Sequence, residues 1–232
     1  MSDETEAVTE SAKAIKEVAK TGGKLIDAAS DAGRFFKAVM GDLVTDGVGL
    51  VSDRLKYYRI ERAILLAAKT QKRLEDRGIT NVRIVSPKIA LPIIEKATIE
   101  DDESLHTRWA NLLANAMDPN FGGQVKRRYV SILSDIEPID AHILDVVVGE
   151  YRAAPEANRQ DLLFARANVV RNLRLDANDC EVSLRNLLRL GLIRPGVVTG
   201  GVYMGEHQVS AYKDTELFSL TLLGIEFHDA VN

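Results

Sequence analysis

Apolar side chains recur at helical spacing through most of the chain, and the clearest stripe lies in residues 88–119. One side of this stretch carries apolar residues at positions i, i+4, i+7, i+8 and i+11, namely Leu105, Trp109, Leu112, Leu113 and Ala116. A carboxylate, Asp101 or Asp102, stands where the helix needs an N-cap, and Pro119 marks its end. An earlier helix pattern contains Pro92. The acidic run 100–103 joins the two helices.

Residues 53–77 predict one long helix that Gly78 ends, and residues 79–86 form at most a short extended segment. Before it, residues 11–55 show an amphipathic stripe with many small residues, broken near Gly22. Small residues let another helix approach closely, as in an oligomer seam, a helical hairpin or a membrane-surface element. Ordinary packing onto the body is the favoured interpretation. Contact with a membrane or a second subunit would use Phe35, Phe36 and Leu43.

The C-terminal third predicts helices over 126–136, 139–151, 164–173 and 177–190. Asp176 is the expected N-cap of the last of these, and Gly191 its left-handed stop. Its inward-facing residues are expected to be Leu184, Leu187 and Leu188.

Short apolar runs follow on both sides of Gly200-Gly201, which is typical of a hairpin turn. A strand over 216–220 and a closing helix capped by Thr221 complete the pattern. The last three of the four predicted helices, followed by the hairpin, the strand and the closing helix, resemble a winged helix.

The predicted fold is therefore mainly α with a small β component, with an N-terminal helical region followed by a C-terminal winged-helix-like domain. We expect three parts. Residues 1–52 form an amphipathic helical region, residues 53–137 a helical core, and residues 138–232 the winged-helix-like domain.

Composition sets limits on function. The chain has 232 residues, of which 46% are hydrophobic and 28% charged, an ordinary globular composition. Its net charge of −4 gives no overall attraction to nucleic acid. The single Cys180 permits no internal disulfide, and the start of the chain lacks a secretory signal pattern, so we expect a reducing, cytoplasmic setting. Charges interrupt the apolar region 35–51, which excludes a membrane-spanning helix there.

No pattern predicts catalysis. The four histidines, His106, His142, His207 and His228, stand in separate elements without metal-ligand spacing. Acidic neighbours raise the pKa expected for Cys180, which makes it a poor nucleophile. The sequence also lacks a phosphate-binding loop and a nucleophile elbow. We therefore predict no enzyme, no catalytic residue, no metal, no cofactor and no small-molecule substrate.

A winged helix that reads nucleic acid would present its second helix to the major groove, with Arg185, Asn186 and Arg189 outermost and Arg194 near the backbone. Asp176, Asp179 and Glu181 lie at the leading end of that helix, where phosphates would repel them. The balance favours a structural or protein-binding winged helix, and nucleic-acid binding is the alternative.

Two asparagines, Asn111 and Asn115, share one side of the helix that contains Trp109. Asparagine is unfavourable inside a helix, so a nearby group must use these amides. The favoured interpretation is a local hydrogen bond, with the 119–123 turn as the expected partner. The alternative is that Arg108 and the two amides form a polar recognition patch. Trp109 is predicted to be a core anchor.

The runs Ile89-Ala-Leu-Pro-Ile-Ile-Glu-Lys-Ala, Glu100-Asp-Asp-Glu and Trp109-Ala-Asn-Leu-Leu-Ala-Asn-Ala resemble the signature of the Abi-alpha (abortive infection alpha) family of bacterial proteins. The resemblance extends from about Val51 to the C-terminus. The family supplies no catalytic residues, and its motif positions look like fold determinants. They are Pro92, Asp102, Trp109, Asn111, Leu112, Leu113, Asn115 and Pro119.

The resemblance implies a role in antiphage defence by abortive infection. Our leading hypothesis is a protein that acts through a protein partner or self-association, with the N-terminal region mediating assembly or toxicity. Nucleic-acid binding by the winged helix and membrane-surface binding by the N-terminal region are the alternatives.

Overall fold

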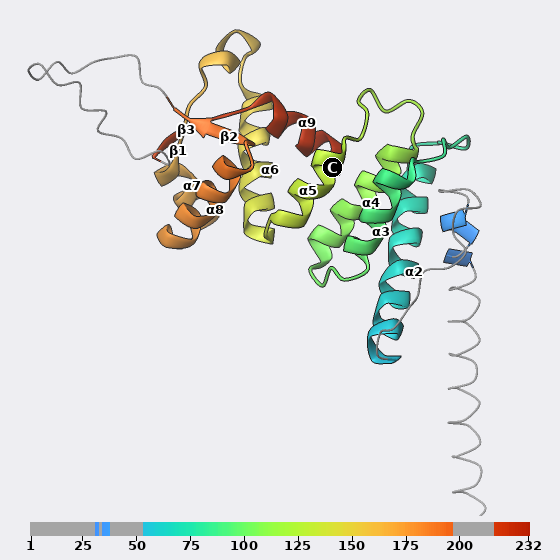
Figure 1. The fold of residues 1–232 in the computed structure, drawn as a ribbon. Helices are drawn as coiled ribbons and strands as arrows, with labels where there is room; N and C mark the ends of the chain where they lie inside the picture. Colours follow the sequence, from blue (N-terminus) through green and yellow to red (C-terminus); the bar gives the residue numbers. More distant parts are fainter. Residues whose placement is uncertain (1–30, 33, 38–52, 197–215) are drawn as a thin grey trace, which may run out of the picture.

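Helices α2, α3 and α4 pack together at one end of the molecule (Figure 1). The computed structural model describes residues 31–32, 34–37, 53–196 and 216–232, with side chains in the first long helix from Arg59 onward. The three helices are α2 (Asp53–Asp76), α3 (Pro87–Ala97) and α4 (Glu103–Met117). They confirm the helices expected over 53–77 and 88–119.

Helix α4 is the centre of this group, because both α2 and α3 pack on it. All five residues of the predicted stripe on α4 are buried, with Trp109 only 1% exposed. Asp102 caps the helix by accepting from the backbone N–H groups of Ser104 and Leu105, each at 2.9 Å. Gly78 ends α2 with φ of +67°, a conformation that favours glycine. The prediction for this region is confirmed.

The chain continues through two helices and a short 3-10 helix towards a small antiparallel sheet of strand order β1-β3-β2. The elements are α5 (Arg127–Asp135), α6 (Pro138–Ala153), η2 (Glu156–Asp161), β1 (Phe164–Ala165), α7 (Arg166–Leu173), α8 (Ala177–Arg189), β2 (Ile193–Pro195), β3 (Leu217–Leu220) and α9 (Leu222–Val231).

One predicted helix starts later than expected. Phe164 and Ala165, which fit the helical pattern of 164–173, form strand β1 by pairing with Phe218 and Leu217 of β3. The rings of Phe164 and Phe218 stack with centroids 5.7 Å apart. This pairing with a distant strand outweighs the local helical periodicity.

The other predicted boundaries are close to the observed ones. Asp176 caps α8, and Gly191 follows the helix with φ of +73°. Thr221 caps α9 by accepting from the backbone N–H of Gly224 at 3.0 Å. Of the predicted inward-facing residues of α8, Leu184 and Leu187 are fully buried, whereas Leu188 is half-buried.

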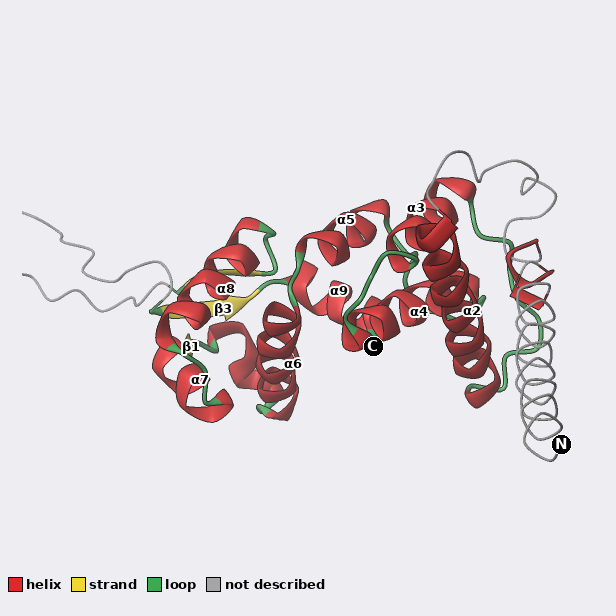
Figure 2. Ribbon diagram, turned by 90° about the horizontal axis from the view of Figure 1, so that it is seen from below, coloured by secondary structure: helices red, strands yellow, loops and turns green. Residues whose placement is uncertain are grey.

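Helix α9 returns from the sheet and packs on both α6 and α4, so it joins the two ends of the molecule (Figure 2). The described chain is thus mainly helical with a small three-stranded sheet, as predicted. The expected turn at Gly200-Gly201 lies outside the described residues, so the wing itself stays a prediction. The three-part division of the chain also stays a prediction.

Candidate functional site

The two asparagines of α4 hold the last turn of α9. Asn111 Nδ2 donates to the backbone oxygen of Val231 at 3.1 Å, and Asn115 Nδ2 donates to that of Ala230 at 2.9 Å. Carbonyls in the last turn of a helix have no partner within the helix, so these amides satisfy them. The expectation that these amides bind the 119–123 turn was wrong. The amides bind an element more than a hundred residues further along the chain.

Arg108, the third member of the suggested recognition patch, lies in the same junction. Its Nη1 donates to Asn232 Oδ1 at 2.9 Å, and its Nη2 donates to Asp145 Oδ2 at 2.5 Å. His228 Nε2 lies 3.2 Å from the other oxygen of Asp145. We call these six residues the α4–α6–α9 hub: Arg108, Asn111, Asn115, Asp145, His228 and Asn232.

The hub is closed to large ligands, because Arg108 and His228 are each only 9% exposed and Asn115 1%. Burial raises the pKa of Asp145, but the hydrogen bond from His228 and the charge of Arg108 outweigh burial and hold this pKa below its usual value. The carboxylate is therefore ionised and paired. The hub connects three helices and does not present a recognition surface.

Four of the remaining motif residues, the three apolar ones and the aspartate, serve the fold. Trp109, Leu112 and Leu113 are in the core. Asp102 is the cap of α4, and its hydrogen bonds from the Ser104 hydroxyl and the Leu105 backbone N–H lower its pKa. Pro92 lies inside α3, and the exposed Pro119 follows the C-cap residue of α4.

Two of the three arginines proposed for nucleic-acid contact are paired with carboxylates of the same chain. Arg185 lies 2.7 Å from Glu181 on its own helix, and Arg189 lies 3.3 Å from Asp135 of α5. Arg194 Nε donates to Ser219 Oγ at 2.9 Å. The ion pairs of Arg185 and Arg189 offset positive charge that a phosphate backbone would require, whereas the hydrogen bond of Arg194 to a hydroxyl leaves its charge in place.

Asn186, the fourth residue of that set, is turned inward. Its Nδ2 donates to the backbone oxygen of Asp135 at 2.9 Å and to Asp140 Oδ2 at 2.7 Å. The amide thus ties α8 to the start of α6, and the expectation that Asn186 points outward with the arginines was wrong. For nucleic-acid binding, helix α8 therefore offers two exposed cationic side chains, Arg185 and Arg189.

Of the residues assigned to membrane or assembly contact, Phe36 is buried, with 8% exposure, and Phe35 is half-buried beside it. Their rings meet edge to face at 5.4 Å. Phe36 belongs to the core together with Ala32, so this short helical stretch is attached to the body. Leu43 lies outside the described residues. The structure supports the interpretation of packing onto the body for Phe36.

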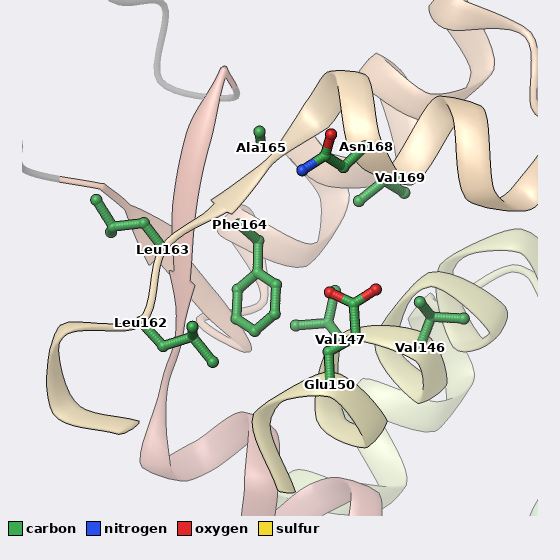
Figure 3. A pocket seen from close by; sticks show the side chains of 9 residues that line it. All are labelled: Val146, Val147, Glu150, Leu162, Leu163, Phe164, Ala165, Asn168 and Val169. Carbon is green, nitrogen blue, oxygen red and sulfur yellow. The ribbon is translucent and has the colours of Figure 1, made fainter. Parts of the chain in front are cut away.

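A pocket of about 210 Å³ opens between α6, β1 and α7 (Figure 3). It is smaller than the roughly 300 to 1,000 Å³ of most small-molecule sites. Its lining is mainly apolar and consists of Val146, Val147, Glu150, Leu162, Leu163, Phe164, Ala165, Asn168 and Val169.

Both polar residues of the pocket have partners within the chain. Glu150 Oε1 accepts from Asn172 at 3.3 Å, and Asn168 Oδ1 accepts from Arg171 at 2.7 Å. The pocket therefore offers a ligand an apolar wall with few uncommitted polar groups.

In the described ranges, no three side chains among His, Cys, Asp and Glu are arranged to hold a metal ion. Cys180 is buried, and this burial raises the pKa of its thiol. Over the same ranges, no helix has both the length and the apolar character needed to cross a membrane.

His106 is fully buried between α2 and α4. Its Nε2 lies 3.2 Å from the backbone oxygen of Arg62. Burial, together with the charges of Arg62 and Lys69, lowers the pKa of His106 from 6.5 to about 4. The ring is therefore neutral in the folded protein at neutral pH.

This lowered pKa predicts a pH-dependent stability. The unfolded state binds a proton at His106 below about pH 6.5, whereas the folded state does so only near pH 4. The free energy of unfolding should therefore be highest above pH 6.5 and lose about 3 kcal/mol from this group as the pH falls to 4. Urea unfolding at several pH values measures this loss.

The His106→Gln variant isolates the effect, because glutamine can keep a donor for Arg62 without titrating. We expect its stability to fall less steeply between pH 6.5 and 4 than that of the wild type. His142→Gln, at an exposed position of α6, is the matched control and should follow the wild type. Equal slopes for His106→Gln and the wild type would contradict the prediction.

Taken together, the fold and its polar clusters define a helical protein in which α9 fastens a small sheet-containing end to a helical end. The family model for abortive infection alpha matches residues 61–231, and the chain belongs to this family. No curated protein and no solved structure matches the chain.

Proposed function

We propose that this protein is a cytoplasmic antiphage defence protein that acts by abortive infection through protein contacts or self-assembly rather than catalysis. The observation that carries the proposal is the family match, which spans α2 to α9 and is thus a property of the whole folded body. The family name supports the abortive infection role.

The architecture of the C-terminal part supports a role in contacts. Helices α6, α7 and α8 precede strands β2 and β3, and β3 lies between β1 and β2, an arrangement that resembles a winged helix. The helix that would read DNA has its arginines paired with Glu181 and Asp135, which favours a protein-binding winged helix.

The N-terminal region is the proposed assembly element. Ala32 and Phe36 fix one short helical stretch to the core. A segment attached in this way can contact another subunit without disturbing the fold.

Deletion of residues 1–30 tests this role. We expect the variant to lose protection against phage and to keep the unfolding transition of the wild type, because Ala32 and Phe36 remain on α2. The measurements are plating efficiency on a phage panel and the thermal unfolding midpoint. Deletion of residues 1–50 is the comparison, and it should also lower that midpoint because it uncovers apolar surface of α2. Full protection by the 1–30 deletion would contradict the assembly role.

A further inference from the structure

A groove lined by acidic residues lies between the start of α6 and helix α8. Both helices are at the sheet-containing end of the molecule (Figure 1). The groove has a volume of about 570 Å³. We call this feature the acidic groove. Its lining residues are Asp135, Glu137, Ile139, Asp140, Asp179, Val182, Ser183 and Asn186.

Four of these lining residues carry carboxylates, and none is Lys or Arg. Asp140 is buried and accepts from the backbone N–H of Glu137 at 3.0 Å, so it serves the fold. Asp135 pairs with Arg189 at the edge of the groove. Glu137 and Asp179 are exposed, and neither is paired with a cation among the described residues. Glu137 is the N-cap of α6 and Asp179 lies in the first turn of α8, so the groove presents two exposed carboxylates without an ion-pair partner among the described residues.

Two apolar side chains lie among these carboxylates. Val182 on α8 is 69% exposed, and Ile139 on α6 is half-buried. A partner that combines lysines with apolar side chains would satisfy both features, because the lysines would meet the carboxylates while the apolar groups covered Val182. Nucleic acid would meet repulsion from the same carboxylates.

The chain itself contains a segment of this chemistry. Residues 13–26 carry four lysines and a single acid, Glu17, and they include the apolar Ile15 and Val18. Their charge of +3 is opposite to that of the groove. The stretch that follows them is fixed to α2, at the end of the molecule remote from α8 (Figure 1). A second copy can bring its segment to the groove directly.

We propose that the acidic groove binds residues 13–26 of a second copy of this chain. The inference rests on the assembly function proposed above and gives it a binding surface. Because each copy has one segment and one groove, two copies satisfy both contacts reciprocally in a closed two-fold dimer.

Paired charge reversals on the full chain test the proposal by sedimentation velocity. The groove variant is Glu137→Lys with Asp179→Lys, which reverses the two exposed carboxylates of the groove that have no ion-pair partner among the described residues, and the segment variant is Lys16→Glu with Lys20→Glu. We expect the wild type to dimerise in a salt-sensitive manner. Each variant alone should raise the dimer dissociation constant at least about tenfold, since like charges then face each other.

Mixing the two variants gives the sharpest outcome. The reversed groove then meets a reversed segment, and the normal groove meets a normal segment, so a 1:1 dimer should reappear. The control is Glu156→Lys with Asp161→Lys, two exposed acids of η2 outside the groove, and it should dimerise as the wild type does. Circular dichroism confirms that each variant is folded.

The inference is overturned by a wild type that stays monomeric at every concentration, by reversed variants that dimerise normally, or by a mixture that stays monomeric. Salt-sensitive binding of duplex DNA by the wild type that Arg185→Ala with Arg189→Ala abolishes would also overturn it, by assigning this face to nucleic acid. The outcome is separable from the proposed function. Dimers without phage protection would refute the defence role alone, and protection by a monomeric wild type would refute the groove alone.

Discussion

The Trp109→Ala variant should lose about 3–5 kcal/mol of unfolding free energy, the range for removing a large buried aromatic side chain. Trp109 is 1% exposed on α4, the helix on which α2, α3 and α9 all pack. Its indole Nε1 has no hydrogen-bond partner among the described residues, so the loss comes from packing. Urea unfolding monitored by circular dichroism measures it.

Trp109→Phe is the matched control for this prediction. Phenylalanine keeps an aromatic ring in the core and leaves a smaller cavity, so we expect a loss of about 1–2 kcal/mol. A loss below about 1 kcal/mol for Trp109→Ala would contradict the central place of α4 in the core.

The Gly224→Ala variant should lose about 3 kcal/mol, the upper end of the range for overpacking, because a clash with backbone cannot be relieved by a side-chain rotation. A Cβ at this position would lie 2.2 Å from the backbone oxygen of Leu192 and 3.0 Å from Leu220 Cδ1. Gly224 is in the first turn of α9, where its N–H donates to Thr221. Helix α9 would have to move away from the sheet, which would also strain its contacts with Asn111 and Asn115.

Gly149→Ala provides the control for the same substitution in open space. Gly149 is an exposed residue of α6, and a Cβ there would meet no atom within 4 Å. Alanine is the better helix former, so this variant should gain up to about 1 kcal/mol. Equal thermal midpoints for the two variants would show that the close approach of α9 to Leu192 does not exist in solution.

Local features of the fold could be predicted from the sequence because their causes are local. Asp102, Asp176 and Thr221 cap helices through hydrogen bonds to residues two or three positions away, and such spacing is visible in the chain. Gly78 and Gly191 end helices by adopting a conformation that other residues avoid. The buried stripe of α4 follows from the helical period.

Long-range partners could not be predicted in this way. The spacing of Asn111 and Asn115 indicates that their amides share one side of α4, but it contains no information on which element covers that side. The covering element proved to be α9. The same limit applies to Arg189, because its partner Asp135 comes from a different helix. Asp145 and His228 of the hub were missed because each stands alone in its own segment.

The structure also changes which experiment isolates the N-terminal region. A deletion of residues 1–50 would remove Ala32 and Phe36 from the core and would mix loss of stability with loss of function. Deleting residues 1–30 avoids this, since both side chains stay in place.

Phage infection at two multiplicities tests the central claim most directly. Bacteria expressing the intact chain are infected at low and at high multiplicity, beside cells that carry the empty vector. The account predicts survival of the culture at low multiplicity, and at high multiplicity early death of the infected cells without a phage burst. Normal phage yield at both multiplicities across the panel would contradict the defence role.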